Sequence, residues 1–242
     1  MLELRHIYFE ADDGLGKKQI LKDINLMIED KSFTVITGPN GGGKSTLAKL
    51  IAGIEKPTSG KILLDGQDIT NMDITMRAKA GIGFAFQQPV RFKGLTVHDM
   101  ISLAAEKNLS VEEACGYLSE VGLCAKDYIK RELNASLSGG ELKRIEIAMV
   151  IARKSMLSVF DEPEAGIDLW SFHSLIKVFE KIRALTRGSI IIISHQERIL
   201  EIADQIIILA NGSIKETGSK EELLPDLLMN SNTCKFYKEV QS

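Results

Sequence analysis

The sequence predicts an α/β fold with a mixed, mainly parallel sheet core, an N-terminal antiparallel β subdomain and an inserted helical subdomain. Three observations predict it. Short apolar strands alternate with helical segments between residues 156 and 209, as in a parallel sheet covered on both faces. Residues 1–30 alternate as paired strands do, and residues 88–150 have a helical period. We expect one domain spanning residues 1–242.

Two strand-like runs open the chain. Leu2, Leu4 and Ile7 mark the first run, and the second lies within residues 20–28. The segment between them, residues 11–16, is polar and contains two glycines, which is typical of a flexible turn. We therefore expect a hairpin-like antiparallel sheet ahead of the core.

The next element is a glycine-rich loop between a strand-like run at 32–37 and helix-forming residues at 47–52. It reads G-x-x-x-x-G-K-S, the pattern of a loop whose backbone N–H groups surround phosphate oxygens. Lys44 would reach the β- and γ-phosphates, and the Ser45 hydroxyl would ligate Mg²⁺. The whole stretch is Gly38, Pro39, Asn40, Gly41, Gly42, Gly43, Lys44, Ser45 and Thr46.

Two further short strands are expected at 61–66 and 82–86, before the helical insertion. Within the insertion, Ser110 and Glu113 form a capping box ahead of apolar residues at helical spacing, and Gly122 is typical of a helix end. About residues 88–150 are therefore expected to form the helical subdomain.

Polar residues follow the apolar strands of the second half. The strand at 156–160 leads into Asp161 and Glu162, and the strand at 189–194 leads into His195. Carboxyl ends of parallel strands are where ligands bind in such sheets. We expect Asp161 to hold Mg²⁺, and Glu162 to position or deprotonate the attacking water. The remaining elements expected are a helix at 169–185, a strand at 205–209 and a helical tail after residue 221.

Composition bounds the function. The net charge of −3 and pI of about 5.9 disfavour a nucleic-acid partner. The apolar runs are too short to insert directly into a membrane, so we expect a cytoplasmic location. Three cysteines (Cys115, Cys124 and Cys234) without a C-x-x-C pair fit a reducing compartment, and a ligand role for any of them is disfavoured.

A second glycine-rich stretch, L-S-G-G-E at 137–141, opens a helix and is a candidate anion-binding site. Five motifs in order, from the phosphate loop to His195, resemble the ATP-binding cassette (ABC) ATPases over about residues 2–220. The resemblance implies a P-loop ATPase that converts ATP and water to ADP and phosphate, with Mg²⁺, in an ATP-dependent head-to-tail homodimer. It implies that Gln87 contacts Mg²⁺ and that Asp168 belongs to the D-loop. It implies that Ser138, Gly139 and Gly140 close on ATP held by a second subunit. It also implies that the catalytic residues are Lys44, Glu162 and His195.

One feature of that family is missing. The aromatic residue that stacks on adenine should fall near Ala11, and alanine cannot stack. Recognition of the base is therefore either weak or supplied by the loop at 12–16.

Within the ABC ATPases, three stretches are similar to SufC, the ATPase of SUF iron–sulfur cluster assembly. Residues 84–90 read F-A-F-Q-Q-P-V, against A-F-Q-x-P-V in that family. Residues 141–147 read E-L-K-R-I-E-I, similar to K-K-R-x-E-I, where transporters more often read Q-Q-R-V-A-I-A. Residues 194–200 resemble its H-x-x-R-L-L. Glu164 departs from the pattern, because that family usually has aspartate there.

This resemblance implies a soluble, SufB/SufD-like scaffold protein as partner. ATP-driven closure would reach the scaffold through the Gln87 loop, with Pro89 and Val90 at the contact. The alternative is the nucleotide-binding subunit of an ABC membrane transporter. A cassette that acts on nucleic acid is disfavoured by the acidic pI.

Overall fold

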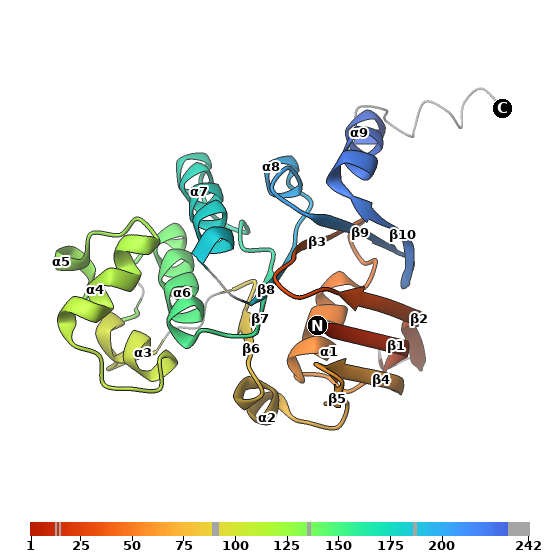
Figure 1. Ribbon diagram of the computed structural model, residues 1–242, viewed down its shortest axis with the longest axis horizontal. Coiled ribbons are helices and arrows are strands. Elements are labelled where there is room, and N and C mark those ends of the chain that lie inside the picture. Colours follow the sequence, from red (N-terminus) through yellow and green to blue (C-terminus); the bar gives the residue numbers. More distant parts are fainter. Residues whose placement is uncertain (13, 15, 89–91, 135–136, 186–187, 232–242) are drawn as a thin grey trace.

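Two β-sheets and a group of helices at one end make up the structure (Figure 1). It is a computed structural model that describes residues 1–12, 14, 16–88, 92–134, 137–185 and 188–231. The smaller sheet contains β1 (Leu2–Asp12), β2 (Lys17–Ile28), β4 (Ser59–Leu64) and β5 (Gln67–Asp68). The larger sheet contains β3 (Phe33–Thr37), β6 (Ile82–Ala85), β7 (Leu157–Asp161), β8 (Ser189–Ile193), β9 (Gln205–Ala210) and β10 (Ser213–Ser219).

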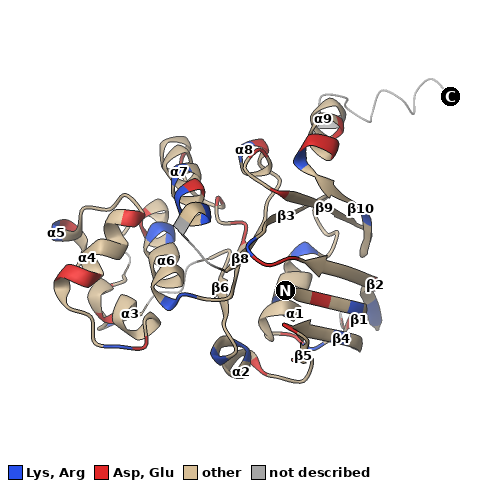
Figure 2. Ribbon diagram, in the orientation of Figure 1, with Lys and Arg blue, Asp and Glu red and all other residues tan. Residues whose placement is uncertain are grey.

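The described helices are α1 (Lys44–Ala52), α2 (Ile74–Lys79), α3 (Val97–Ala104), α4 (Val111–Glu120), α5 (Ala125–Tyr128), α6 (Gly139–Arg153), α7 (Leu169–Leu185), α8 (Glu197–Leu200) and α9 (Lys220–Ser231). None of the helices in the described ranges is long and apolar enough to cross a membrane. Acidic and basic residues are interspersed along the ribbon (Figure 2).

The smaller sheet has the order β2-β1-β4-β5, with antiparallel pairs throughout. Leu2 faces Ile28 and Leu4 faces Leu26 across the first pair, and all four side chains are buried. The paired N-terminal strands predicted from the alternation of residues 1–30 are therefore confirmed.

The larger sheet has the order β10-β9-β3-β8-β7-β6, and every neighbouring pair except β9 with β10 is parallel. Strands β3, β7 and β8 are buried along their whole length, because both faces of the sheet are covered there. Ile190 and Ile192 of β8 join the core formed with the helical end, whereas Ile191 and Ile193 join the core shared with the smaller sheet and α1. The predicted mixed sheet is confirmed.

The helical end is formed by α3, α4, α5 and α6 (Figure 1). The predicted capping box is present, since Ser110 Oγ accepts a hydrogen bond from the Glu113 N–H, and Glu113 Oε2 accepts one from the Ser110 N–H. Helix α4 ends at Glu120, two residues before Gly122. Three short elements were not predicted: β5, α2 and β10. The first two have two and six residues, too few for a periodic pattern, and β10 is largely polar.

Arg77 on α2 is fully buried and joins α1 to the segment that follows β5. Its guanidinium donates to the carbonyl oxygens of Leu50 and Ile51 at the last turn of α1, and to that of Thr70 at 2.9 Å. Burial lowers the pKa of Arg77 to about 10. A cation at this end complements the helix dipole, so Arg77 anchors the helix that follows the glycine-rich loop.

Arg77→Met should lower the free energy of unfolding by about 1–3 kcal/mol, because the carbonyl groups of four residues (Leu50, Ile51, Thr70 and Met72) lose their donor. Urea denaturation measures the change. The control is Arg5→Met, which removes an exposed pair with Glu3 and should have a much smaller effect. Equal losses in the two variants would contradict the anchoring role.

Candidate nucleotide site

The glycine-rich loop joins β3 to α1, as the motif requires. Gly38 has φ of 135° and Gly43 has φ of 101°, a backbone region that favours glycine. A Cβ on Gly38 would lie 2.0 Å from the carbonyl oxygen of Leu209 on β9. Gly43 caps α1 without a side-chain hydrogen bond, so the first N–H groups of α1 remain available to an anion.

The back of the loop is held by the turn between β9 and β10. The Gly212 N–H donates to the Gly42 carbonyl at 3.1 Å, and the Gly212 carbonyl accepts from the Lys22 N–H at 2.7 Å. Strand β2 of the smaller sheet is thereby tied to the loop through one glycine. The two sheets therefore fix the loop from both sides.

Lys44 is the first residue of α1, directly after the loop, and is only 5% exposed. Its Nζ donates to the carbonyl oxygens of Gly38 at 2.7 Å and Pro39 at 2.9 Å. Burial lowers the pKa of Lys44, while the nearby Glu162 and Asp161 carboxylates oppose that shift. The loop thus already holds the ammonium group that we expect to meet the phosphates.

The end of β7 meets the start of α1. Ser45 Oγ donates to Asp161 Oδ1 at 3.0 Å, and Asp161 is buried. Burial raises the pKa of Asp161, and the bond from Ser45 opposes this. A hydroxyl oxygen and a carboxylate oxygen held together are ligands of the kind that Mg²⁺ prefers, so the residues present fit this ion.

Glu162 and Gln87 meet across the sheet edge. Gln87 Nε2 donates to Glu162 Oε2 at 2.6 Å, and Gln87 follows β6, the strand beside β7. Glu162 has φ of 43°, a strained conformation for a residue with a side chain. Its N–H donates to the Ile193 carbonyl at 3.0 Å, which fixes the turn that carries the carboxylate.

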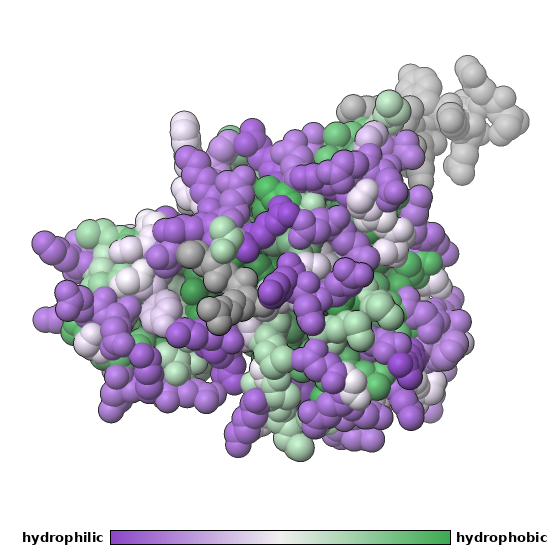
Figure 3. Space-filling view, in the orientation of Figure 1, coloured by the Kyte–Doolittle hydropathy of each residue, from purple (hydrophilic) through white to green (hydrophobic). Residues whose placement is uncertain are grey.

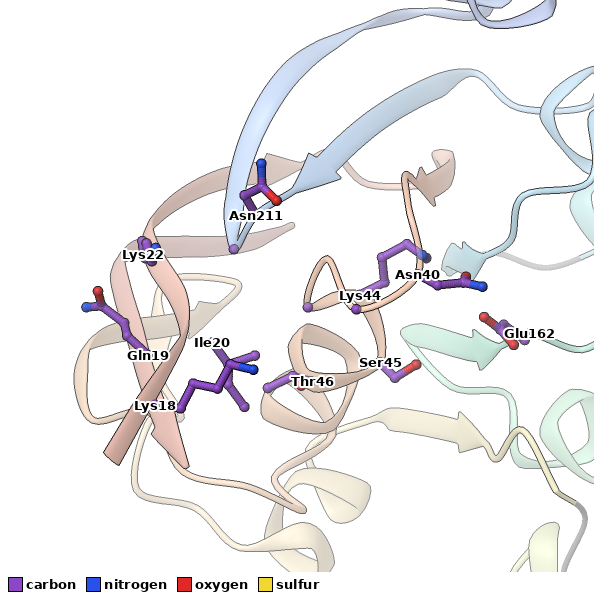
Figure 4. Close-up of a pocket in the computed structure, with 13 residues that line it drawn as sticks. Lys18, Gln19, Ile20, Lys22, Asn40, Lys44, Ser45, Thr46, Glu162 and Asn211 are labelled. Atoms are coloured by element: carbon purple, nitrogen blue, oxygen red, sulfur yellow. The ribbon is translucent and has the colours of Figure 1, made fainter. Parts of the chain in front are cut away.

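A cavity of about 530 Å³ lies over the loop (Figure 4). Figure 4 shows it between Lys18 and Ile20 of β2 on one side and Glu162 on the other, with Lys44 between them. Its lining is Lys18, Gln19, Ile20, Lys22, Asn40, Gly41, Gly43, Lys44, Ser45, Thr46, Glu162, Asn211 and Gly212.

The end of this cavity away from Glu162 has no aromatic side chain among its described lining residues. Ala11 pairs with Lys18 across β1 and β2. Ile20 and the aliphatic stem of Lys18 are the apolar surfaces available there to a base. Sequence reasoning missed the residues of β2 and of the β9–β10 turn, because strand pairing distant in sequence brings them to the loop.

The second glycine-rich stretch lies outside the lining of this cavity. Ser138 caps α6, and a Cβ on Gly139 would lie 3.0 Å from the Gly166 carbonyl oxygen in the segment that precedes Asp168. Asp168 accepts bonds from the N–H and the hydroxyl of Ser171, which lower the pKa of Asp168. These residues form a separate surface, so within one chain they do not complete the nucleotide cavity.

His195 follows β8 and is exposed, with Nε2 at 3.3 Å from Gln196 Nε2. It is absent from the cavity lining. The preceding Ser194 is fully buried, donates its hydroxyl to Glu164 Oε1 and accepts from the Gln196 N–H at 3.0 Å. The turn that carries His195 is thus fastened to the segment after Glu162.

Two comparisons decide the family. The profile of the family described as "ABC transporter" matches residues 21–165, more than half of the chain. The chain belongs to the ABC family. It is 38% identical over 217 residues to the "Uncharacterized ABC transporter ATP-binding protein MJ0035" of Methanocaldococcus jannaschii, with 86% of each chain covered.

Other ABC proteins are similar. The "Probable ATP-dependent transporter ycf16" of Pyropia yezoensis is 36% identical, over 90% of this chain and 91% of its own length. The "Sulfate/thiosulfate import ATP-binding protein CysA" of a Synechocystis species is 34% identical, over 86% of this chain and 59% of its own length.

Solved ABC cassettes have the same fold. A dimeric post-hydrolysis state of the ATP-binding cassette MJ0796 with ADP and Pi has a TM-score of 0.81 and 25% identity, and covers 91% of this chain and 99% of its own. The ADP conformation of the cassette MJ1267 has a TM-score of 0.81 and 26% identity, over 98% of each chain. The ATP-hydrolysing activity expected from the sequence is that of the ABC ATPases, and cassettes of this family form dimers.

Some residues predicted to matter lie outside the described residues: Pro89, Val90 and Cys234. Cys115 is partly buried against the helical core, and Cys124 is exposed. The described residues contain no group of three or more His, Cys, Asp or Glu side chains arranged to hold a metal ion.

Glu162→Gln should stop hydrolysis while ATP stays bound, because an amide keeps the shape of the carboxylate but accepts no proton. ATP with Mg²⁺ should then produce a stable dimer, measured by size-exclusion chromatography with light scattering. Wild-type protein, which turns ATP over, is the control. A variant that remains monomeric with ATP, with and without its partner, would contradict a site shared by two chains.

Ionisation of Glu164 should lower the free energy of unfolding as pH rises. Burial raises its pKa above the ordinary 4.5, although the Ser194 hydroxyl opposes this shift, and Glu164 Oε2 is buried without a partner. The folded chain therefore holds a proton that the unfolded chain releases, and stability declines above pH 4.5 up to the raised value.

The test of this pH dependence is urea denaturation of wild type and Glu164→Gln at several pH values. The variant should have the flatter profile and should exceed wild type only above the ordinary pKa of glutamate. Parallel profiles would show that the carboxyl group ionises without penalty.

Proposed function

We propose that this ABC ATPase uses a head-to-tail dimer, with two ATP sites each built from both chains, to drive a SUF-type iron–sulfur assembly scaffold. Within each site, Lys44 and the N–H groups of the loop would bind the β- and γ-phosphates. Ser45 and Asp161, with Gln87, would hold Mg²⁺, which supplies charge neutralisation at the phosphates.

Glu162 would position the attacking water and take its proton, because its carboxylate stands at the end of the cavity beyond Lys44 (Figure 4). Gln87 restrains that carboxylate through its 2.6 Å bond. His195 would approach the γ-phosphate after closure, since it is exposed and lies at the same sheet edge.

The second chain would supply Ser138, Gly139 and Gly140. Their position on a surface separate from the cavity supports this proposal, because one chain leaves the phosphates open to water. ATP between the two chains would favour the closed dimer, and hydrolysis would remove that bias.

The observation that carries the SUF assignment is a contact between two of the SufC-like stretches. Lys143 and Glu146, from the stretch similar to K-K-R-x-E-I, both bond the backbone of Phe86, which lies in the A-F-Q-Q-P stretch. Transporter cassettes more often have glutamine and alanine at these two positions. The residues that distinguish the families thus act together, beside Gln87.

An apolar groove next to Phe86 could receive the scaffold. Two adjoining cavities of about 220 and 150 Å³ share Phe84, Phe86, Met149 and Val150. Figure 3 shows apolar side chains over α2 and β6, which border the larger cavity. Phe86 is 37% exposed, a large apolar surface for a partner to cover.

The names of these relatives favour a second candidate. The proteins of M. jannaschii and P. yezoensis are named as transporter components, and the groove could equally receive a helix of a membrane subunit. The nature of the stimulating partner distinguishes the two functions.

A soluble scaffold should raise the ATPase rate without detergent or lipid. Phe92→Asp should remove most of that stimulation, because Phe92 is 38% exposed and lines the smaller cavity, where a charge disfavours an apolar partner. Met229→Asp is the matched control, since Met229 is 72% exposed on α9, away from the groove.

Basal ATPase should be unchanged in both variants, and stimulation should persist in Met229→Asp. Stimulation that requires a membrane-embedded partner would replace the SUF function with the transporter function. Loss of basal activity in Phe92→Asp would show that Phe92 supports the fold rather than the contact.

A further inference from the structure

Lys143 and Glu146 form a buried ion pair on α6. Their side chains are 2% and 10% exposed, and Lys143 Nζ lies 3.1 Å from Glu146 Oε2. Burial raises the pKa of Glu146, and the Lys143 ammonium opposes that rise. A buried pair is often no more stabilising than apolar residues of similar size, so burial of the pair is weak evidence for a stabilising role.

The pair holds one residue of the chain by both of its backbone groups. Glu146 Oε1 accepts from the Phe86 N–H at 2.9 Å, and Lys143 Nζ donates to the Phe86 carbonyl. Phe86 stands just after β6, whose pairing with β7 ends at Ala85. The two side chains therefore replace the strand partner that Phe86 lacks.

The clamped residue precedes Gln87, whose side chain bonds Glu162. We propose that Lys143 and Glu146 are positioning residues for ATP hydrolysis, which clamp the Phe86 backbone and thereby set Gln87 against the Glu162 carboxylate. Ser138 caps the start of helix α6, so one helix links the surface expected to close on a second chain to the catalytic carboxylate of its own chain.

The clamp accounts for the charge and burial together. A donor and an acceptor on the same helix face can together satisfy the N–H and the C=O of one residue, and positions three apart lie on one face. A backbone held at both groups cannot rotate without breaking two charge-assisted bonds. The peptide group that leads into Gln87 is therefore fixed. Helix α6 thereby determines where the Gln87 side chain lies relative to Glu162.

The test is the double variant Lys143→Met/Glu146→Met, because apolar replacement of both partners leaves no unpaired buried charge. Single-turnover hydrolysis of radiolabelled ATP by the full chain gives the rate, and titration with a fluorescent ATP analogue gives the affinity. The rate should fall about tenfold or more, since small misplacements of catalytic groups have such effects. Affinity should stay within a factor of about two, because the phosphate loop is unchanged.

A double-mutant cycle with Gln87→Ala separates positioning from general damage. If Lys143 and Glu146 act through Gln87, adding their double substitution to the Gln87→Ala variant should change the rate by less than about twofold. Lys181→Met/Glu120→Met is the matched control, since it removes a Lys–Glu pair at 2.6 Å that does not contact Phe86, and its rate should equal wild type. Lys143→Arg, which keeps a donor, should retain more activity than the double variant.

An equal loss of rate in both Gln87 backgrounds would overturn the proposal, as would an unchanged rate in a folded double variant. If the double variant does not fold, the Lys143→Arg and Glu146→Gln single variants carry the same cycle, with the same two outcomes decisive. The assay contains no partner protein, so failure of the SUF assignment does not alter its result.

Discussion

Parallel pairing of β3, β8, β7 and β6 is the constraint on which the rest of the structure depends. It brings the carboxyl ends of four strands to one edge, and three of these ends carry a residue proposed for the nucleotide site. Lys44 follows β3, Glu162 follows β7 and Gln87 follows β6, although they are up to 118 residues apart in the chain. Chemistry at this edge therefore follows from strand order, and the apolar faces of β8 keep that order fixed.

Local patterns could be predicted from the sequence. The glycine-rich loop, the strand before Asp161 and the capping box at Ser110 each depend on residues within a few positions of one another. The cavity wall at Lys18 and Ile20 could not, because pairing of β1 with β2 and the Gly212 contact bring it to the loop.

Burial of charge was the other property that the sequence did not reveal. Lys143 and Glu146 have the composition of an exposed helix face, and Arg77 that of a surface residue, yet all three are buried. Each is buried because backbone groups at the end of a strand or helix need partners that the regular ladder does not supply. The SufC-like motifs were visible in the sequence, but the contact that Lys143 and Glu146 share with Phe86 depends on tertiary packing.

In the proposed dimer, each ATP site is completed by Ser138–Gly140 of a second chain, since these residues lie away from the nucleotide cavity of their own chain. Mixing Lys44→Ala protein with Ser138→Arg protein tests it most directly, because a mixed dimer contains one site in which both contributions are intact. Neither variant alone should hydrolyse ATP, whereas the mixture should. A mixture as inactive as its two components would contradict a site shared by two chains.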